Sequence, residues 1–265
     1  MRLSTLTWKE AARAAAQPAA FVVPLGSLEQ HGPHLPLLTD TAIVDAIAAR
    51  LDDRMPDRVV LLPTIWLGHS PHHRHFASVS LDLLPYVEMI RGVCRSLVQL
   101  GATKILLLNG HGGNDVPARA ALRELKSELA DRPDVYIVFA HYWHLAADAI
   151  AAIRSSPRGG LGHACELETS LMLTLHGDLV YEGLGVTDGP HDQGPWRIGD
   201  MLHGQPYYIV NEFDEISRTG TVGMPEQATA DKGARFLDAI VGRVGAFVDE
   251  FLTWRYQHDA HRFRE

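Results

Sequence analysis

The stretch Lys-Ile-Leu-Leu-Leu at 104–108 runs directly into Asn-Gly-His-Gly-Gly-Asn at 109–114, and this junction decides the fold. An uninterrupted aliphatic run ended by a glycine-rich loop predicts a strand that is buried on both faces. Three other segments share the pattern, at 20–25 (AFVVPL), 58–62 (RVVLL) and 135–140 (VYIVFA). Longer amphipathic segments separate these runs, which indicates a mainly parallel sheet. We therefore predict an α/β fold of three layers, α/β/α, around a mainly parallel central sheet.

Helices are expected between and after these strands. Helical periodicity covers 41–51, 84–100, 117–130, 165–175 and 226–254, and Thr39 or Asp40 is expected to open the first of these helices. The segment 207–210 (YYIV) is apolar enough for one more strand, and 195–205 is the least regular stretch. The 265 residues contain no internal repeat and no linker-like segment. We expect a single domain that spans 1–265.

Composition excludes several classes of protein. Apolar residues make up 46% of the chain and charged residues 21%, which excludes a disordered or fibrous protein. The formal net charge of −8 favours neither a nucleic-acid nor a membrane partner. The two cysteines cannot build a disulfide framework, and no run reaches the roughly 18 apolar residues of a membrane span, so we expect a cytoplasmic protein. Fifteen histidines beside 24 lysines and arginines suggest a metal or proton-transfer site.

The first candidate site is the loop 26–40 (GSLEQHGPHLPLLTD), which follows the first predicted strand. In open α/β sheets, ligands bind at the carboxyl ends of the strands. Glu29 and His31 are two residues apart, so an extended backbone places both on one side. Together with Asp40 they offer the mixed oxygen and nitrogen ligands that a divalent metal accepts. The alternatives are that Asp40 only caps the following helix and that Glu29 is an ordinary surface carboxylate.

The second candidate site is the loop 109–114, where three glycines surround His111. Glycines let the backbone approach a ligand closely. One alternative is a phosphate-binding turn at the start of a helix, although the spacing fits neither the dinucleotide fingerprint nor a Walker loop. Another alternative is a glycine-rich turn with a merely structural histidine.

The third candidate site is 162–170 (GHACELETS). Glu168 lies in an otherwise apolar run, and a buried carboxylate is costly unless it is paired or bound to a cation. It is therefore either a metal ligand or the partner of a buried arginine. His163, Glu166 and Glu168 cannot share one helix face at this spacing, and we expect Glu166 to be solvated. Cys165 is expected to be a small core residue.

The remaining histidines carry weaker signals. Four of them crowd one proline-containing loop and either line a pocket or are solvated: His69, His72, His73 and His75. His141 and His144 follow the strand at 135–140, so they are expected at the same edge of the sheet. His258 and His261 lie in a charged C-terminal tail and are expected at the surface.

Together, these blocks resemble the signature of the creatininase (creatinine amidohydrolase) family. The resemblance rests on EQHGPHLP at 29–36 with Thr39-Asp40, on NGHGGN at 109–114, and on GHA at 162–164 with ETS at 168–170. The later segment 220–233, with Gly223, Pro225 and Ala-Thr-Ala at 228–230, is similar to the C-terminal block of that family. The resemblance implies an α/β/α fold and a hydrolytic site with two divalent metal ions per chain, zinc or manganese, with iron as a further option.

The resemblance also implies roles for individual residues. By position, five residues match metal ligands of the family: Glu29, His31, Asp40, His111 and Glu168. Asp40 matches the carboxylate that bridges two cations roughly 3.5–4 Å apart, and a water held between such cations is acidic enough to be hydroxide near neutral pH. This hydroxide would attack the carbonyl carbon. His163 matches a catalytic position beside the substrate, where a histidine passes the proton to the leaving nitrogen.

Two departures from the family pattern concern the substrate. In creatinine-specific members the second block is similar to N-G-H-Y-E-N. In this chain, Gly112 and Gly113 stand in place of the Tyr and the Glu. Those members also carry a Trp-Asp pair where this chain has Gly159 and Gly160. A substrate-binding surface of Gly112, Gly113 and His163 lacks the aromatic wall and the aspartate, so creatinine is not the expected substrate. Glu168 would have to replace the missing glutamate at the metals.

We therefore expect a hydrolase of a C–N amide-type bond in a small molecule: a cyclic amide, a formamide or a peptide-like amide. The family also includes a deformylase of a pyrimidine precursor, a mycofactocin peptidase and hydrolases of cyclic sugar derivatives. The alternatives are hydrolysis of a cyclic sugar ketone or lactone at the same dinuclear site, and a non-catalytic small-molecule binding protein. The resemblance further implies a homo-oligomer, often a hexamer, with 69–81 and 207–213 as candidate contact segments.

Overall fold

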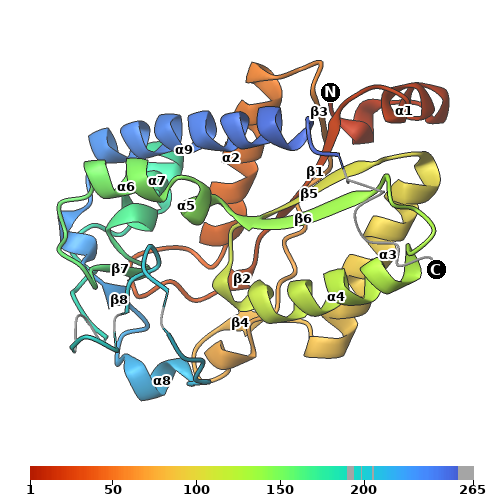
Figure 1. Cartoon of the computed structure of the whole chain (residues 1–265). Coiled ribbons are helices and arrows are strands. Elements are labelled where there is room, and N and C mark those ends of the chain that lie inside the picture. The colour runs from red at the N-terminus through yellow and green to blue at the C-terminus, as the bar shows by residue number, and fades with distance from the viewer. Residues whose placement is uncertain (190–193, 198, 205, 256–265) are drawn as a thin grey trace.

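The centre of the molecule is a four-stranded parallel sheet in the order β3-β1-β5-β6. A computed structural model describes residues 1–189, 194–197, 199–204 and 206–255 (Figure 1). The four strands lie where uniform apolar runs predict them: β1 (Ala20–Leu25), β3 (Val59–Leu61), β5 (Lys104–Asn109) and β6 (Tyr136–His141). All pairs between them are parallel, which confirms the prediction of a mainly parallel sheet.

Helices cover both faces of this sheet, as Figure 1 shows. One layer contains α2 (Thr39–Arg54), α5 (Tyr142–Leu145), α6 (Ala147–Ile153), α7 (Glu166–His176) and α9 (Ala230–Phe251). The opposite layer contains α1 (Trp8–Ala15), α3 (Leu83–Leu100) and α4 (Asp115–Glu128). The predicted α/β/α architecture is therefore confirmed.

The alternation of side chains along the strands produces two separate cores. Val22 and Leu106 point into the core below α2, α7 and α9, whereas Phe21 and Ile105 point into the core below α3 and α4. Since successive side chains of a strand face opposite sides, a strand buried on both sides must be apolar at every position. This is why the runs in β1 and β5 show no polar alternation.

Short elements hold the loops at the carboxyl edge of the sheet. β2 (Leu28–Glu29) pairs with β4 (Ser78–Val79), and β7 (Leu161–His163) pairs with β8 (Val222–Gly223), both antiparallel. Among the described residues there are also single turns of 3₁₀ helix at Leu3–Thr5, Pro71–His73, Gly112–Asn114, Gly177–Leu179 and Pro225–Gln227. The pairing of β2 with β4 brings the loop that contains Glu29 next to the histidine-rich loop of residues 69–75.

Two predicted elements are wrong. The segment 207–210 is not a strand: it forms an irregular connection before the short helix α8 (Phe213–Ile216), and its four side chains are 42–77% exposed. Apolar composition alone did not make this segment a strand, because it pairs with no strand in the described part of the chain. The terminal helix begins at Ala230 rather than at Glu226, because Thr229 is extended and caps it by accepting a hydrogen bond from Lys232 N.

Further expectations concern a membrane span, the C-terminal histidines and the oligomeric state. No helix within the described ranges is long and apolar enough to cross a membrane. His258 and His261 lie outside the described residues. Homo-oligomerisation, with 69–81 and 207–213 as candidate contact segments, stays a prediction.

Glu166 corrects the expectation of a solvated helix residue. Its side chain is fully buried, and Lys232 Nζ of α9 lies 2.7 Å from its Oε1. The backbone N–H groups of Ser155 and Ser156 also donate to its two oxygens, at 2.8 Å each. Burial by itself would raise the pKa of Glu166, but these donors, with Lys232 the strongest, hold it below its usual value. Glu166 therefore ties α7 to α9 and does not face water.

We expect Lys232→Ala to lower the free energy of unfolding by about 3 kcal/mol, because it leaves a buried carboxylate without its cation. Arg235→Ala provides the matched control on the same helix: Arg235 pairs with Asp231 at the surface and should cost less than about 0.5 kcal/mol. Urea denaturation of both variants measures the difference. Equal losses in the two variants would show that the buried pair does not stabilise the fold.

Candidate metal centre

The structure brings all five predicted metal ligands to one place at the carboxyl edge of the sheet. Four separate segments deliver them: the loop after β1, the first turn of α2, the loop after β5 and the first turn of α7. The five side chains are buried, with relative exposures of 5% or less: Glu29, His31, Asp40, His111 and Glu168. In Glu29, His31 and Asp40, one candidate ligand atom from each lies within 4.8 Å of the others.

Asp40 lies at the centre of this cluster. Its Oδ1 is 3.0 Å from His31 Nε2, and its Oδ2 is 3.0 Å from His111 Nδ1. Glu29 Oε1 lies 3.2 Å from the same His111 nitrogen, and Glu168 Oε1 lies 3.9 Å from His31 Nε2. The cluster therefore has two halves, with Glu29 and His111 on one side and His31 and Glu168 on the other, and Asp40 reaches both.

Backbone carbonyls set the tautomers of three histidines. A carbonyl oxygen can only accept, so His31 Nδ1 donates to Glu29 O at 3.1 Å and His111 Nε2 donates to His69 O at 3.1 Å. His163 Nε2 likewise donates to Gln30 O at 2.7 Å. In the neutral form of each ring, the other nitrogen then carries a lone pair directed into the cluster. Metal-bound histidines are typically oriented by such hydrogen bonds to their second nitrogen.

The donor set fits divalent cations. The ion pairs of Glu29, Asp40 and Glu168 within the described ranges are all with histidines, so no lysine or arginine neutralises these three carboxylates. Asp40 Oδ2 has no hydrogen bond among the described residues, although His111 Nδ1 is only 3.0 Å away. Both atoms therefore point toward a common space rather than at each other. Buried carboxylates in such a set require a positive charge between them.

Without cations the cluster must hold protons instead. Burial opposes a charge on His31, but the neighbouring Asp40 carboxylate outweighs it and raises the pKa of His31 to about 9. Burial raises the pKa of Glu168 to about 7. Burial would also raise the pKa of Glu29, yet His111 and His73 hold it well below its usual value. A metal ligand must be deprotonated, so a cation competes with the proton on His31.

We therefore expect metal loading to release protons. Below about pH 9 His31 carries a proton in the metal-free protein, so loading at about pH 7.5 should release at least one proton per chain. Above pH 9 the contribution of His31 should fade, whereas His111, whose pKa is also raised well above its usual value by Glu29 and Asp40 against the effect of burial, continues to release its proton. Titration of zinc or manganese into chelator-treated protein, followed with an indicator dye in weak buffer, measures the number. A release that does not depend on pH would contradict the assignment of His31.

His163 lies beside the cluster rather than at its centre. Its Nδ1 is 3.8 Å from Glu29 Oε1, and its ring centroid is 4.1 Å from that of His31. Burial, together with the nearby His31 and His73, holds the pKa of His163 well below its usual value. The imidazole is therefore neutral near pH 7 and able to accept a proton. This state is consistent with the predicted catalytic role of His163, which stays a prediction.

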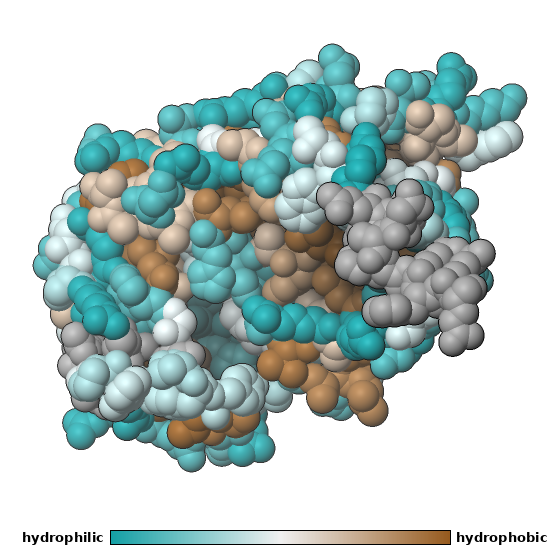
Figure 2. All heavy atoms as spheres, viewed as in Figure 1, coloured by the Kyte–Doolittle hydropathy of each residue, from teal (hydrophilic) through white to brown (hydrophobic). Residues whose placement is uncertain are grey.

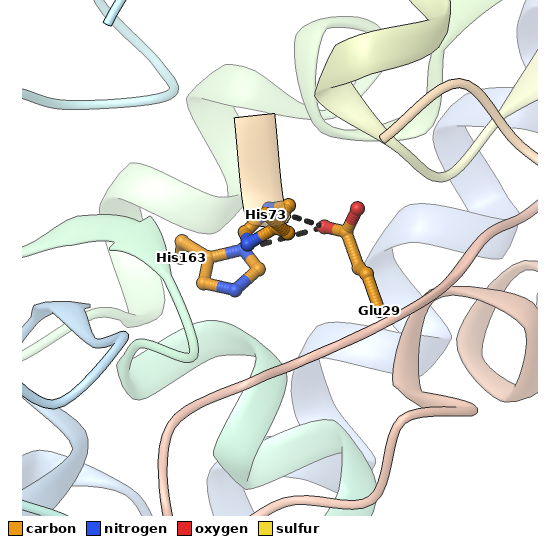
Figure 3. Close-up of side chains that lie close together, drawn as sticks. All are labelled: Glu29, His73 and His163. Atoms are coloured by element: carbon orange, nitrogen blue, oxygen red, sulfur yellow. Dashed lines mark ion pairs between the residues drawn. The ribbon is translucent and has the colours of Figure 1, made fainter. Parts of the chain in front are cut away.

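Sequence reasoning did not assign a role to His73, which contacts the cluster directly. Its Nε2 lies 3.1 Å from Glu29 Oε1, and Figure 3 shows the rings of His73 and His163 turned toward that same oxygen. Gln30 Nε2 donates to His73 Nδ1 at 2.9 Å, so the proton of a neutral His73 ring is on Nε2 and faces Glu29. His73 Nε2 therefore lies beside the Glu29 carboxylate, although it makes no hydrogen bond to a described residue. The only sequence signal for His73 was the presence of four histidines in seven residues. This pattern does not indicate which of the four faces the cluster.

Two serines link Glu29 to His111 within one half of the cluster. Ser27 Oγ donates to Glu29 Oε2 at 3.2 Å and lies 2.7 Å from Ser70 Oγ. Ser70 Oγ in turn lies 3.2 Å from His111 Nε2. Both serines are fully buried. The hydroxyl pair links a carboxylate and an imidazole of the cluster, and nothing in the sequence singles these residues out.

The alternatives for Glu168 and for the loop at 109–114 can now be weighed. Glu168 faces His31 and the backbone N–H of Cys165 rather than an arginine, so the buried-arginine reading is wrong. Asp40 is in the first turn of α2, but it makes no side-chain cap there. His111 faces the carboxylates of Glu29 and Asp40, which argues against a phosphate held by the glycine-rich loop.

Gly112 and Gly113 differ in the space around them. A Cβ at Gly113 would lie 2.2 Å from His69 O and 2.4 Å from His111 Nε2, two atoms that are hydrogen-bonded to each other. A Cβ at Gly112 would meet no atom within 4 Å. Both glycines line the cleft that leads to the cluster. Only Gly113 is therefore required by packing.

We expect Gly113→Ala to weaken metal binding roughly 10- to 100-fold, because the new methyl group separates His111 from the carbonyl that orients it. Gly112→Ala is the matched control and should bind metal like the unaltered protein. Metal affinity by competition with a coloured chelator measures both. Equal affinities of the two variants would contradict the packing argument.

The cluster lies at the bottom of a cleft of about 840 Å³. Figure 2 shows this hollow between the amino end of α4 and the segment around α8. His141 and His144 line it, as their position after β6 predicts, together with Asp115 and Arg119 of α4. His141 Nε2 and Arg119 Nε both donate to Asp115 Oδ1, at 2.8 and 2.9 Å. The part of the cleft wall at the amino end of α4 is therefore polar and hydrogen-bonded.

Three carboxylates and two imidazoles at the carboxyl edge of an α/β/α sheet form a donor set that a divalent cation accepts. A family profile described as creatininase, creatinine amidohydrolase, matches residues 4–248. This chain belongs to the creatininase family.

Individual relatives agree with this family. The chain is 31% identical to the creatinine amidohydrolase of Pseudomonas putida over 265 residues, which cover 93% of this chain and 95% of the relative. It is also 31% identical to the mycofactocin precursor peptide peptidase of Mycobacterium ulcerans, over 84% of this chain and 81% of that protein. A crystal structure of creatininase matches with a TM-score of 0.80 and 28% identity, covering 96% of this chain and 98% of that chain. Similar solved structures include a manganese form and a Zn–Zn form of creatininase.

Proposed function

We propose that this protein is a metal-dependent amidohydrolase that cleaves a C–N amide-type bond. The observation that carries the proposal is the convergence of five buried side chains from four segments, with Asp40 between the other four. Family membership points to the same chemistry, since the relative from Pseudomonas putida is a creatinine amidohydrolase.

The proposed residue roles follow from the geometry. Glu29 and His111 would hold one divalent cation, His31 and Glu168 the other, and Asp40 would bind both. When bound, such cations polarise a carbonyl group and lower the pKa of water. His163, neutral and with Nδ1 free, would take up a proton and pass it to the leaving nitrogen. Zinc and manganese are the proposed metals, in line with the solved relatives.

We propose that the substrate is larger than creatinine. A cleft of about 840 Å³ is at the upper end of the range for small-molecule sites, which is about 300–1,000 Å³. Gly112 and Gly113 offer no side chain to enclose a small ring. The polar wall of Asp115, Arg119 and His141 would instead contact a second part of the substrate. A formamide or peptide-like amide attached to a polar body fits these features better than a single small ring.

A second candidate reaction is hydrolysis of a cyclic ketone or lactone at the same centre. The observation that favours it is the 25% identity with the 3-dehydro-scyllo-inosose hydrolase of Thermotoga maritima, which extends over 94% of this chain. A formamide is favoured by 34% identity with a Methanobrevibacter smithii deformylase, but that match covers only 44% of this chain. Both reactions require the same activation of water, so the cluster alone does not separate them.

Metal analysis and a substrate screen test the proposal together. Elemental analysis of the purified protein should find close to two divalent ions per chain. The same preparation should hydrolyse one member of a panel of formamides, lactams, short peptides and lactones, and chelation should abolish that activity. Glu29→Gln should lose metal and activity, whereas the exposed helix residue Glu124→Gln should lose neither. A fully active preparation without metal would refute the proposal.

A further inference from the structure

His72 lies beside the buried cluster. Neither the family pattern nor the proposed reaction assigns it a role. It belongs to the 3₁₀ turn Pro71–His73 and lines the cleft. One ligand atom each of Glu29, His72 and His111 lies within 4.8 Å of the other two. Neither ring nitrogen of His72 forms a hydrogen bond with a residue in the described ranges. The ring thus sits beside two proposed ligands with its own donor atoms unused.

The space that His72 occupies exists because residue 113 is a glycine. A Cβ at Gly113 would lie 2.7 Å from His72 Cε1. The imidazole of His72 also lies parallel to that of His111, with centroids 5.8 Å apart and planes 6° apart.

The other histidines of the same loop are already committed. His69 Nδ1 donates to Leu81 O at 2.9 Å, and His69 belongs to none of the candidate metal-ligand groups among the described residues. His73 accepts from Gln30 at Nδ1, so its Nε2 carries a proton toward Glu29 and offers no lone pair. His75 is exposed, and its Nε2 accepts from Arg74 Nε. His72 is thus the residue of this loop whose ring is free to bind a cation.

We propose that His72 is a further ligand of the cation held by Glu29, Asp40 and His111, and that it makes this position selective for zinc over manganese. Imidazole nitrogen suits zinc, whereas manganese prefers carboxylate and water oxygen. A ligand from His72 beside that of His111 thus shifts the donor set of this position from oxygen toward nitrogen. The inference rests on the metal centre of the proposed function, but not on any particular substrate.

The experiment compares His72→Ala with His75→Ala, an exposed histidine three residues away. Chelator competition on the full chain measures the affinity of each of the two positions for zinc and for manganese. His72→Ala should weaken zinc binding at one position on the order of 10- to 100-fold and change manganese binding much less, while His75→Ala should match the unaltered protein. Zinc affinities in His72→Ala that equal those of the unaltered protein at both positions would overturn the proposal.

Cobalt substitution gives a second, independent reading. The visible absorption of bound Co²⁺ depends on the nitrogen ligands of the ion and on its coordination number. His72→Ala should therefore change the spectrum of the cobalt protein and His75→Ala should not; identical spectra would overturn the proposal. These readouts separate two failures. Two bound ions without hydrolysis of any panel compound would refute the proposed reaction alone, whereas a protein that binds no metal would refute both proposals.

Discussion

Asp40→Asn is expected to abolish hydrolysis and reduce the metal content from two ions per chain to less than one. Asp40 is the residue whose two oxygens face different halves of the cluster, at 3.0 Å from His31 Nε2 and 3.0 Å from His111 Nδ1. An amide offers one oxygen and one NH₂ group, so it cannot bind two cations, and it removes one of three negative charges. Because metal activation contributes several kcal/mol, kcat/KM should fall on the order of 10³-fold or more.

The matched control is Asp45→Asn, the same substitution on the same helix. Asp45 is exposed and bonds Thr64 Oγ1, outside the cluster, so this variant should keep both metals and full activity. Elemental analysis and initial rates with the substrate from the screen measure both variants. If Asp40→Asn retained two ions per chain, Asp40 would not be the shared ligand, and the two-cation arrangement would need another bridge.

His163→Gln is expected to keep both metals and to lose turnover. His163 donates Nε2–H to Gln30 O and directs Nδ1 toward Glu29, so its ring is placed to move a proton rather than to hold a cation. Loss of a positioned acid–base group costs about 10²- to 10⁴-fold in rate. We therefore expect kcat to fall by this factor, with little change in KM.

His75→Gln is the control for a histidine outside the cluster and should behave like the unaltered protein. The outcome for metal content decides between two roles, because His163 also lies within 4.8 Å of the ligand atoms of His31 and Glu168. A His163→Gln variant that loses one ion would make His163 a ligand and contradict its proposed role in proton transfer. Steady-state kinetics and elemental analysis on the same preparation provide both readings.

The fold was predictable because burial on both faces of a strand leaves a local record. Uniformly apolar runs occur at β1, β3, β5 and β6, and each became a strand of the parallel sheet. The same reasoning failed at 207–210, which is equally apolar but exposed. Apolar composition reports that a segment can be buried, whereas the presence of a partner strand is decided by chain topology.

The candidate site was predictable to the level of the residues that match a family pattern. Glu29, His31, Asp40, His111 and Glu168 all converge in the structure. Glu166, two residues before Glu168, was misjudged because the two carboxylates look alike in sequence. Only the position of α9 shows that Glu166 meets Lys232 while Glu168 faces His31.

The residues that contact and orient the proposed ligands could not be predicted from the sequence. Ser27 and Ser70 lie 43 positions apart, and Gln30 reaches His73 over a similar interval. Such pairs depend on how β2 packs against β4, and no local periodicity reports this. The tautomers of the histidines follow from these contacts, so the assignment of His72 and His73 to different roles also required them.

By its own pattern, the amino-acid sequence determined the layered architecture and the types of donor atom available, because hydrophobic periodicity and residue chemistry are local properties. The tertiary structure alone decided which carboxylates face one another, which imidazole nitrogens stay free and that Gly113 makes room for His72. The physical reason is that distances between loops are set by the packing of helices and strands far apart in the chain, and ligand geometry depends on those distances to a fraction of an ångström.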